Sequence, residues 1–325
     1  MSNSTIRRDR FMHCSAGDPV AANGERATLA RRFVNAWSVA ALLLLLATQT
    51  LAAMPKEETE AEFAARCRSV AAGICLSLNS EAEIASLRSV PQHLTTDTRI
   101  QWDPTHNAAR FTIASRSPAD SAGQLHIPFP ASLTDVYFSF DVRYPSAFLK
   151  HRFIHNGGWK MFILGQGKAG CAPYEIVANN AYYRGYPSFY YKCGEFRGVA
   201  VQNPTGDNPS QFDYQPGGDT SCMRHPDPRA KPCAKFEADA WVTYQVHVNT
   251  IAAFLEVWQT VNGATTKIIE HPLQGFPLPA VRYDWLKLTP YDTGKEATEN
   301  HPSFPIWYRR VIVAAKKIPT PVGEK

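Results

Sequence analysis

Several segments of the chain alternate apolar and polar side chains with a period of two, and this pattern restricts the fold more than any other feature of the sequence. In the clearest segments the apolar positions are Val136, Phe138, Phe140 and Val142, then Val242, Tyr244, Val246 and Val248, then Leu255, Val257 and Val261, and finally Leu286 and Leu288. A period of two places apolar side chains on one face of a β-strand. Because these segments do not alternate with helical patterns, as βαβ units would require, we predict an all-β fold, an antiparallel β-sandwich of the jelly-roll type.

The remaining patterns divide the chain into three parts. The predicted strands cover 107–115, 136–143, 160–164, 173–178, 187–193, 241–249, 254–261, 265–270, 285–289 and 306–315. Asn262-Gly263 is the dipeptide most typical of a tight hairpin turn. Residues 57–90 are rich in Glu, Ala, Arg and Leu and predict helix instead. The predicted organisation is a leader over 1–53, a helical segment over 54–95 and a β-sandwich domain over 96–325.

The leader has the pattern of a secretory signal peptide. Arg31-Arg32 precedes the apolar stretch 33–47, and small residues follow up to Ala52-Ala53. The apolar stretch is shorter than the roughly 18 residues of a membrane span. We therefore expect cleavage near Ala52 or Ala53, a secreted or periplasmic protein, and no membrane span in the mature chain. An uncleaved signal anchor is the alternative.

Much of the positive charge lies in the leader. The formal net charge is +5, and residues 1–53 hold six arginines, no lysine and three acids, so the rest of the chain carries only +2. Nucleic-acid binding requires a concentrated basic face, and a nearly neutral body argues against it. The charge remains compatible with a local basic cleft for an acidic substrate.

Six cysteines follow the leader, and an even number in a secreted chain predicts disulfide bonds. We predict sequential pairing, as Cys67–Cys75, Cys171–Cys193 and Cys222–Cys233. The first pair cannot form within one straight helix, because eight residues of helix span about 12 Å and a disulfide reaches about 7 Å. Gly73 is the expected break in that helix. No metal site is predicted, since closely spaced Cys or His partners are lacking.

One set of candidate binding residues lies on the polar faces of the predicted strands. Aromatic rings interleaved with hydrogen-bonding groups suit a sugar ligand, because rings stack on pyranose C–H faces and polar groups contact hydroxyls. The candidates are Trp241, Gln245, His247, Trp258, Lys287 and Tyr291. The alternative is that these aromatic side chains pack under the helical segment or under a loop.

A second set lies between Gly157 and Gly194, in a segment dense in Tyr, Asn, Lys and Arg. Its candidates are Lys160, Asn179, Arg184, Tyr190, Tyr191 and Lys192. Lys160 and Arg184 would neutralise a uronate carboxylate, with Asn179 or Gln245 assisting. His247 or a tyrosine would then remove the adjacent proton. β-Elimination from a polysaccharide needs this combination of a charge neutraliser, a base and a proton donor to the leaving oxygen.

Parts of the chain resemble a known fold family. The segment Trp241–Asn249, its hairpin partner ending at Asn262-Gly263, and the closing Trp307-Tyr308-Arg309-Arg310-Val311-Ile312-Val313-Ala314 are similar to concanavalin A-like lectin/glucanase sandwiches. Within that fold they look like secreted polysaccharide lyases of the heparin-lyase-like and alginate-lyase-like kinds. The closing strand of that group often reads Trp-Tyr-Asp, and Arg309 replaces the acid here. The resemblance covers roughly residues 100–318 and consists mostly of sandwich framework.

Two fragments are similar to the alginate-lyase branch. The first, Tyr190-Tyr191-Lys192-Cys193-Gly194-Glu195-Phe196, resembles that family's Tyr-Phe-Lys-Ala-Gly-x-Tyr, and the second, Gln245-Val246-His247, resembles its Gln-Ile/Val-His. Phe196 replaces the family's final tyrosine, which acts in proton transfer, and the two fragments occur in the reverse order. If the resemblance holds, another tyrosine must substitute, and Tyr190, Tyr191 and Tyr291 are the candidates.

The leading hypothesis is a secreted β-sandwich protein that cleaves a polysaccharide, with uronate as the expected sugar, by β-elimination. One alternative is a non-catalytic, lectin-like protein, and another is a glycoside hydrolase that uses scattered carboxylates such as Glu175 or Glu256. Hydrolases usually hold two carboxyl groups about 5–10 Å apart. The predicted partner is a polysaccharide and not a nucleic acid, and we expect a monomer. No cofactor is predicted, since no Asp-rich loop specifies the calcium that is common in such sandwiches.

Overall fold

The computed structural model describes residues 57–88, 99–155, 157–167, 175–181, 183, 185–190, 211–212, 234–273 and 281–321. Side chains are described throughout these ranges except at positions 88, 181, 190, 211–212 and 271–272. All of these residues belong to one compact unit, Met54–Lys325. Within them, no helix combines the length and the apolar character that a membrane crossing requires.

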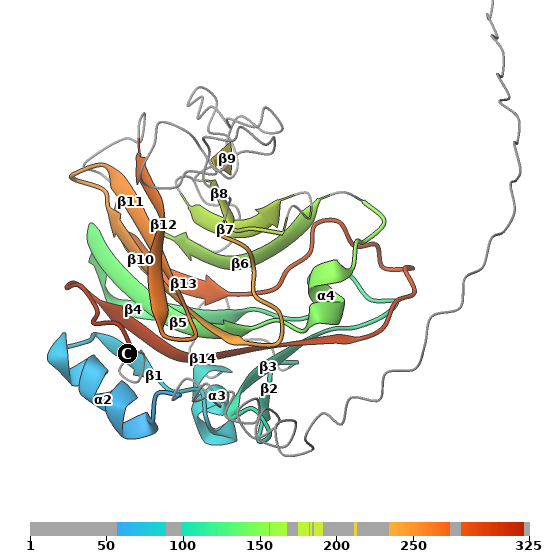
Figure 1. Cartoon of the computed structure of the whole chain (residues 1–325), viewed down its shortest axis with the longest axis horizontal. Helices are drawn as coiled ribbons and strands as arrows, with labels where there is room; N and C mark the ends of the chain where they lie inside the picture. The colour runs from blue at the N-terminus through green and yellow to red at the C-terminus, as the bar shows by residue number, and fades with distance from the viewer. Residues whose placement is uncertain are drawn as a thin grey trace, which may run out of the picture. The chain divides into compact units, whose positions relative to one another are not determined.

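Two antiparallel sheets form the two layers of the fold (Figure 1). The eight-stranded sheet has the order β12 (Ala264–Pro272), β11 (Phe254–Val261), β10 (Trp241–Asn249), β5 (Asp135–Arg143), β14 (Phe304–Ala314), β3 (Ala108–Ile113) and β2 (Gln101–Asp103), with β1 (Ile74–Leu76) also paired to β14. The six-stranded sheet has the order β4 (Leu125–Leu133), β13 (Tyr283–Leu288), β6 (Gly158–Gly165), β7 (Ile176–Ala181), β8 (Ser188–Tyr190) and β9 (Gln211–Phe212). The predicted all-β sandwich is confirmed.

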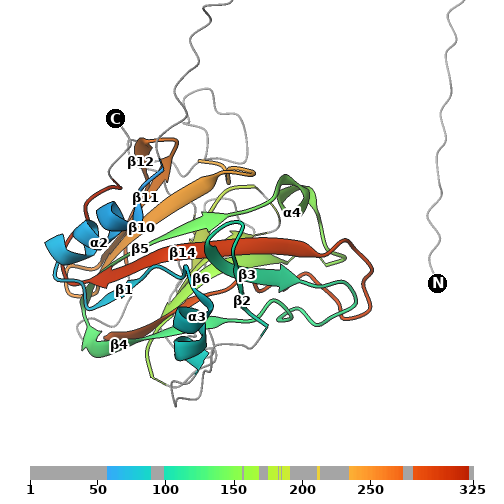
Figure 2. The ribbon, with the colours of Figure 1, turned by 90° about the horizontal axis from the view of Figure 1, so that it is seen from below.

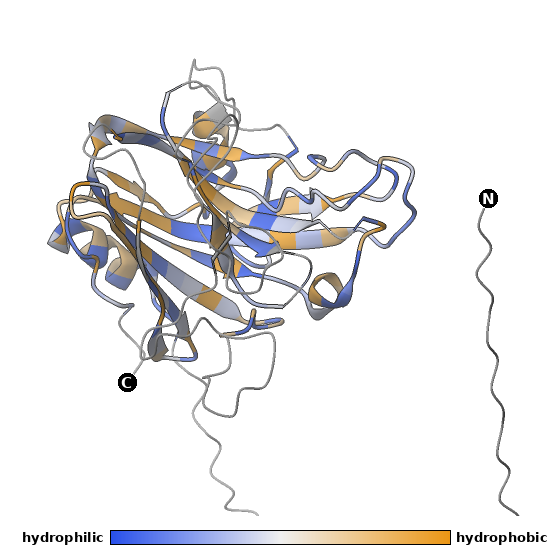
Figure 3. Ribbon diagram, turned by 90° about the horizontal axis from the view of Figure 1, so that it is seen from above, coloured by the Kyte–Doolittle hydropathy of each residue, from blue (hydrophilic) through white to orange (hydrophobic). Residues whose placement is uncertain are grey.

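The apolar positions of the alternating segments form the core between the sheets, as predicted. Along the strands, hydrophobic and hydrophilic residues follow one another as bands in Figure 3. Phe138 and Phe140 of β5 pack against Phe162 of β6, with ring centroids 4.9 and 5.9 Å apart. The Tyr308 hydroxyl of β14 donates a hydrogen bond of 3.0 Å to the Met161 carbonyl of β6. Aromatic packing and this buried hydrogen bond therefore join the two layers.

The predicted hairpin is also confirmed, because β11 and β12 are joined by Asn262 and Gly263. Their φ angles are 47° and 85°. A tight hairpin turn requires positive φ at both central residues, and asparagine and glycine reach that region at the lowest cost.

Four of the described strands and one helix were not predicted, and the reasons are local. β1 and β2 have three residues each and β9 has two, too few to display a period of two. β4 is interrupted by Pro128 and Pro130, and prolines are unusual inside strands. The short helix α4 spans only Ser146–Lys150. The predicted strands 173–178 and 187–193 are shifted, since the observed strands are β7 and β8.

The helical segment predicted over 57–90, with its expected break at Gly73, contains two helices, α2 (Glu60–Ser69) and α3 (Glu81–Arg88). The strand β1 between them was not predicted. The chain leaves α2 at Val70, ahead of Gly73, and Ala71 has a φ of 47°. This reversal brings the Cα atoms of Cys67 and Cys75 to 6.0 Å, and the predicted disulfide between them is confirmed. The other four cysteines after the leader lie outside the described residues.

The N-terminal helix and the C-terminal segment cover part of the outer face of the eight-stranded sheet. Phe63, Cys67 and Val70 of α2 pack with Ile312, Ala314 and Ile318 in a second small core. Figure 2 shows α2 and β1 beside the long strand β14. Burying this surface removes water from the outer side chains of the central strands.

A β-bulge places two consecutive arginines on this outer face. The register of β14 against β5 shifts between Arg309 and Ile312, and Arg310 has a φ of 53°. Asp141 of β5 accepts a hydrogen bond from Arg309 Nε at 3.3 Å and another from Thr243 Oγ1 at 2.7 Å. Arg309 also pairs with Glu57.

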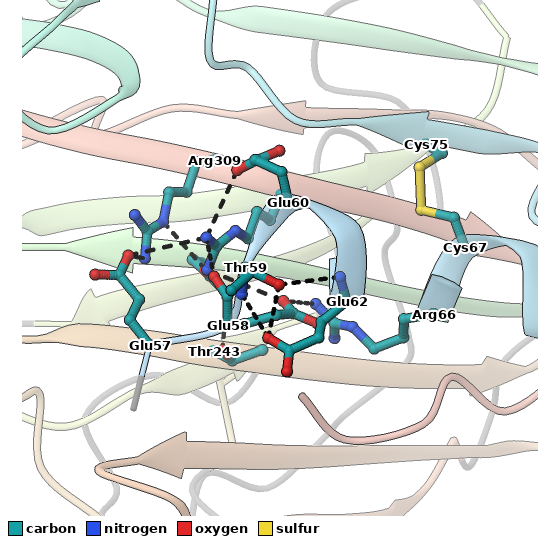
Figure 4. A network of polar contacts seen from close by, with 12 residues as sticks. Glu57, Glu58, Thr59, Glu60, Glu62, Arg66, Cys67, Cys75, Thr243 and Arg309 are labelled. Atoms are coloured by element: carbon teal, nitrogen blue, oxygen red, sulfur yellow. Dashed lines mark hydrogen bonds and ion pairs between the residues drawn. A yellow bond between two sulfur atoms is a disulfide. The ribbon is translucent and has the colours of Figure 1, made fainter. Parts of the chain in front are cut away.

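The remaining acids of this network come from the start of the described chain (Figure 4). Glu58 pairs with Arg66 at 2.8 Å, and its carbonyl accepts a hydrogen bond from Arg310. Burial, more than any neighbouring charge, raises the pKa of Glu58. The segment Glu57–Ser69 is therefore held to the sheet by buried ion pairs as well as by apolar contact, and removing one partner of such a network is costly.

Replacing Asp141 should destabilise the protein strongly. Asp141→Leu leaves Arg309 and Arg310 with fewer acceptors in a buried site, so the free energy of unfolding should fall by about 3 kcal/mol or more. Urea unfolding measures the change. Asp120→Leu, at an exposed position, is the matched control and should change stability by under about 0.5 kcal/mol. Equal effects of the two variants would contradict a structural role for the network.

Candidate functional site

His247 lies on the outer face of the eight-stranded sheet, where both of its ring nitrogens have hydrogen-bond partners. Its Nε2 lies 2.7 Å from Asp135 Oδ1, and its Nδ1 lies 3.1 Å from Glu256 Oε2. Its ring also stacks on Tyr137, with centroids 3.7 Å apart. A general base needs an available nitrogen, and both nitrogens of His247 are already bonded to carboxylates.

The other predicted binding residues on this face also have internal partners. The Arg309 guanidinium lies 3.8 Å from the centroid of the Trp241 ring. The Gln245 side chain donates a hydrogen bond of 2.7 Å to the Ile318 carbonyl of the C-terminal segment. Trp258 has Lys267 and Lys317 over its ring, each with Nζ 5.4 Å from the centroid. These contacts match the alternative in which the aromatic side chains of this face pack within the protein.

The outer face of the six-stranded sheet carries a different set of side chains. On β13, Leu286 and Leu288 enter the core, so Trp285 and Lys287 face outward. Trp285 packs there with Ile163 of β6 and Val177 of β7. The alternation of β7 then places Asn179 on the same face. Lys287 and Asn179, which were predicted from sequence as binding residues, thus share one surface.

A β-bulge brings Lys160 to this surface. By simple alternation Lys160 would share the face of Phe162 and Leu164, which lie in the core. The register of β6 against β7 shifts between Lys160 and Phe162, so that Lys160 pairs with Asn179 and Met161 is the extra residue. Both Met161 and Phe162 are buried in the core. The bulge therefore turns the Lys160 side chain outward, which is a recurrent use of bulges near functional sites.

Lys160, Lys287 and Glu175 form a charged cluster on this face. Lys287 is only 4% exposed and Glu175 only 2%. Burial lowers the pKa of Lys287 to about 8, with Glu175 raising it and Lys160 lowering it further. Burial also lowers the pKa of Lys160, and Glu175 opposes that shift. Glu175 thus interacts with both lysines, and a nearly buried lysine with a pKa close to neutrality is typical of a functional site.

Neutral polar groups surround the cluster. The Ser188 hydroxyl of β8 donates a hydrogen bond of 2.8 Å to Asn179 Oδ1, so the Asn179 amide nitrogen points its two donors elsewhere. His126 of β4 is paired in register with Lys287 of β13. Burial, together with the charge of Lys287, lowers the pKa of His126 to about 4, which keeps this imidazole neutral at physiological pH.

Tyr291 completes the described part of the site. Its carbonyl accepts a hydrogen bond of 2.7 Å from the Lys160 amide. The Lys160 ammonium lies 5.2 Å from the centroid of the Tyr291 ring, within the range of a cation–π contact. Of the three tyrosines predicted for proton transfer, Tyr291 is the one whose side chain the structure describes.

Several predicted site residues lie outside the described part of the chain. They are Arg184, Tyr191 and Lys192, together with the side chain of Tyr190. The backbone of Tyr190 is described, and it pairs with Val177 of β7, a residue of the outer face.

The sequence analysis missed two residues of this surface, His126 and Ser188. His126 lies on β4, which was not predicted as a strand. Ser188 is the first residue of β8, and a single serine carries no signal of its own. A correct assignment of β4 would have placed His126 on the face opposite to the buried Leu125 and Ile127, but only the pairing of β4 with β13 places it beside Lys287.

The arrangement suits the binding of an acidic ligand. Two lysines and an amide lie on one sheet face, and Glu175 is the acid that interacts with both lysines. Among the described residues, no group of three or more His, Cys, Asp or Glu side chains is placed to hold a metal ion.

Comparisons with known proteins find structural likeness without sequence likeness. No family model matches the chain, and no curated protein matches it. The alginate lyase Aly36B is 15% identical over 76% of this chain and 98% of its own, with a TM-score of 0.45. The alginate lyase vAL-1 from Chlorella virus is 12% identical over 75% of this chain and 99% of its own, with a TM-score of 0.41. The botulinum neurotoxin serotype C1 binding domain is 10% identical over 69% of this chain and 43% of its own, with a TM-score of 0.39.

Lys287→Met should stabilise the protein near neutral pH. In the unfolded chain this lysine has a pKa of about 10.4. Folding at lower pH must therefore bury an ammonium group, which costs free energy. The cost is present below the folded pKa of about 8 and disappears as the pH rises toward 10.4. The variant should therefore gain up to about 3 kcal/mol near pH 7, and the gain should shrink near pH 10.

Urea unfolding at both pH values measures this gain. Lys267→Met is the matched control, because Lys267 pairs with Glu256 and Glu270 on the other sheet. It should lose up to about 1 kcal/mol rather than gain stability. A Lys287→Met variant that is less stable than the wild type near pH 7 would contradict the shifted pKa.

Proposed function

We propose that this protein is a polysaccharide lyase that cleaves a uronate-containing glycan by β-elimination on the outer face of its six-stranded sheet. The observation that supports it most is the pair of lysines, Lys160 and Lys287, which share Glu175 but have different environments. Burial lowers the pKa of each lysine and Glu175 opposes the shift. Titratable groups perturbed by burial and by a specific charged partner are typical of a functional site.

Lys160 binds the uronate carboxylate in this proposal. Neutralising that carboxylate makes the adjacent C5 proton more acidic, because the negative charge that develops in the transition state is stabilised. Lys160 has both a suitable charge and a fixed position, since its amide is bonded to Tyr291 and its strand is paired with β7. The amide group of Asn179, across from Lys160 on β7, assists in binding the carboxylate.

Lys287 is the general base. A catalytic base works best when its pKa lies near the operating pH, and burial is the usual means of lowering the pKa of a lysine to that range. Its pKa of about 8 meets this condition, whereas the neighbouring His126, with a pKa of about 4, is too weak a base. Lys287 thus replaces His247 and the tyrosines in the role that the sequence analysis gave them.

Tyr291 supplies the proton for the leaving group. In the reaction Lys287 Nζ takes the C5 proton, a C4–C5 double bond forms, and the C4–O bond breaks with its electron pair. The leaving oxygen receives the Tyr291 hydroxyl proton. Solvent then returns a proton to Tyr291 and removes one from Lys287, so atoms and charges balance.

The first test of the proposal is an activity screen. The purified protein should be incubated with uronate polymers and with neutral polysaccharides, while ultraviolet absorbance and new reducing ends are followed together. We expect both signals to rise on a uronate polymer and neither on the neutral ones. Reducing ends without absorbance would indicate hydrolysis, and binding without either signal would indicate a lectin. Both outcomes would overturn the proposal.

The pH dependence of kcat/KM identifies the role of Lys287. With a base of pKa about 8, kcat/KM should rise with pH and level off above that value. An arginine stays protonated and cannot act as a base, so Lys287→Arg should lower kcat by about 10²- to 10⁴-fold. Lys267→Arg on the other sheet is the matched control and should leave kcat unchanged. A kcat/KM that falls above pH 8, together with an active Lys287→Arg variant, would make Lys287 a carboxylate binder instead.

A further inference from the structure

Three segments that are distant in sequence meet behind Lys160. They are the approach to β6 (residues 153–155 and 157–159), Tyr183 between β7 and β8, and the segment 291–294 that follows β13. The first leads directly into Lys160, the second follows Asn179, and the third begins at Tyr291. Whatever fixes these segments to one another also fixes the proposed site.

A buried Asp–Tyr pair lies at their meeting point. The Tyr183 hydroxyl donates a hydrogen bond of 2.9 Å to Asp292 Oδ1, and the Gly294 amide donates a second one of 2.7 Å to the same oxygen. Asp292 is fully buried, and Tyr183 is only 7% exposed. The Tyr183 ring also lies against the Phe153 ring, with centroids 6.4 Å apart. Tyr183 thus contacts both of the other segments, one through its hydroxyl and one through its ring.

Backbone hydrogen bonds join the same segments. The Thr293 amide and hydroxyl both donate to the Gly158 carbonyl, each at 2.9 Å, and the His155 amide donates to the Gly294 carbonyl at 2.9 Å. A Cβ atom on Gly294 would lie 2.3 Å from the Tyr183 hydroxyl and 2.2 Å from the His155 carbonyl oxygen. Position 294 therefore accepts only glycine in this packing, which leaves little freedom for the segment to shift.

Two residues of the proposed site, Tyr291 and Lys160, are connected directly to the Asp–Tyr pair. Tyr291 immediately precedes Asp292. Its carbonyl accepts a hydrogen bond of 2.7 Å from the Lys160 amide, and its ring lies under the Lys160 ammonium. Asp292 itself forms an isolated antiparallel bridge with Trp159, the residue before Lys160. Asp292 is thus adjacent in sequence to Tyr291 and is itself bridged to the residue before Lys160.

We infer that Tyr183 and Asp292 are positioning residues, which hold Tyr291 against Lys160 and align both with Asn179. The inference rests on the proposed function for its catalytic consequence, but the positioning itself is a property of the fold. Asp292 Oδ2 is buried without a hydrogen-bond partner, and burial, more than any other cause, raises the pKa of Asp292 to about 7. A buried carboxyl of this kind lowers the stability of the fold. Such a loss of stability is common at functional sites and uncommon in a purely structural core.

Tyr183→Phe tests the inference by removing the hydroxyl and leaving the ring. In the folded variant kcat should fall about tenfold or more with KM changed less than about threefold, because misplacing a catalytic group affects the reaction more than binding. Asp292→Ala, which removes the acceptor, should have the same effect. Asp292→Asn keeps an oxygen for Tyr183 and Gly294 and should retain most of the wild-type kcat. Tyr137→Phe, on the outer face of the other sheet, is the matched control and should leave kcat unchanged.

Amide hydrogen exchange provides a readout that does not depend on activity. In Tyr183→Phe the amides of Lys160 and Thr293 should exchange about tenfold faster or more, whereas the amide of Val246 in the other sheet should not change. Unchanged exchange at Lys160, or equally faster exchange at Val246, would overturn the inference. If the wild-type protein cleaves no uronate polymer, the proposed function fails, and the exchange measurement still decides whether Tyr183 and Asp292 position the segment.

Discussion

The alternation of apolar side chains on paired strands is the constraint on which the rest of the structure depends. It commits one face of each sheet to a shared core, in which Phe138, Phe140 and Phe162 are in contact. It therefore also commits the remaining side chains to two outer faces. Polar groups on those faces must either find partners within the protein or remain for a ligand, since unpartnered burial is costly. The two sheets differ in which solution they adopt.

On the eight-stranded sheet, the outer side chains find partners within the chain. The segment Glu57–Ser69 supplies acids for Arg309 and Arg310, and the C-terminal segment accepts a hydrogen bond from Gln245. His247 is bonded to carboxylates through both nitrogens. This face is thereby stabilised as a structural surface. The six-stranded sheet instead holds two lysines near one acid, where burial lowers the pKa of both lysines although Glu175 opposes the shift. Burying charged groups in this way is difficult to explain by stability alone.

Irregularities in the strands, rather than the strands themselves, bring the charged groups to these faces. The bulge in β6 turns Lys160 away from the core, and the bulge in β14 allows Arg309 and Arg310 to serve the same face. Bulges are not visible as a period in the sequence, because they interrupt the period. The close contacts among Tyr183, Asp292 and Gly294 similarly result from packing between loops. They connect the stability of the fold to the geometry of the proposed site.

The sequence by itself determined the layers of the fold and the Asn262-Gly263 hairpin, because alternation and turn preference are local properties. It also predicted the Cys67–Cys75 disulfide by pairing neighbouring cysteines in order. It also singled out Lys160, Asn179, Lys287 and Tyr291 by residue type. Only the tertiary structure decided that these four share one face and that His247, Trp241 and Gln245 lie on another. Strand order and bulges set that division, and both depend on pairing between segments far apart in the chain, so no local pattern contains them.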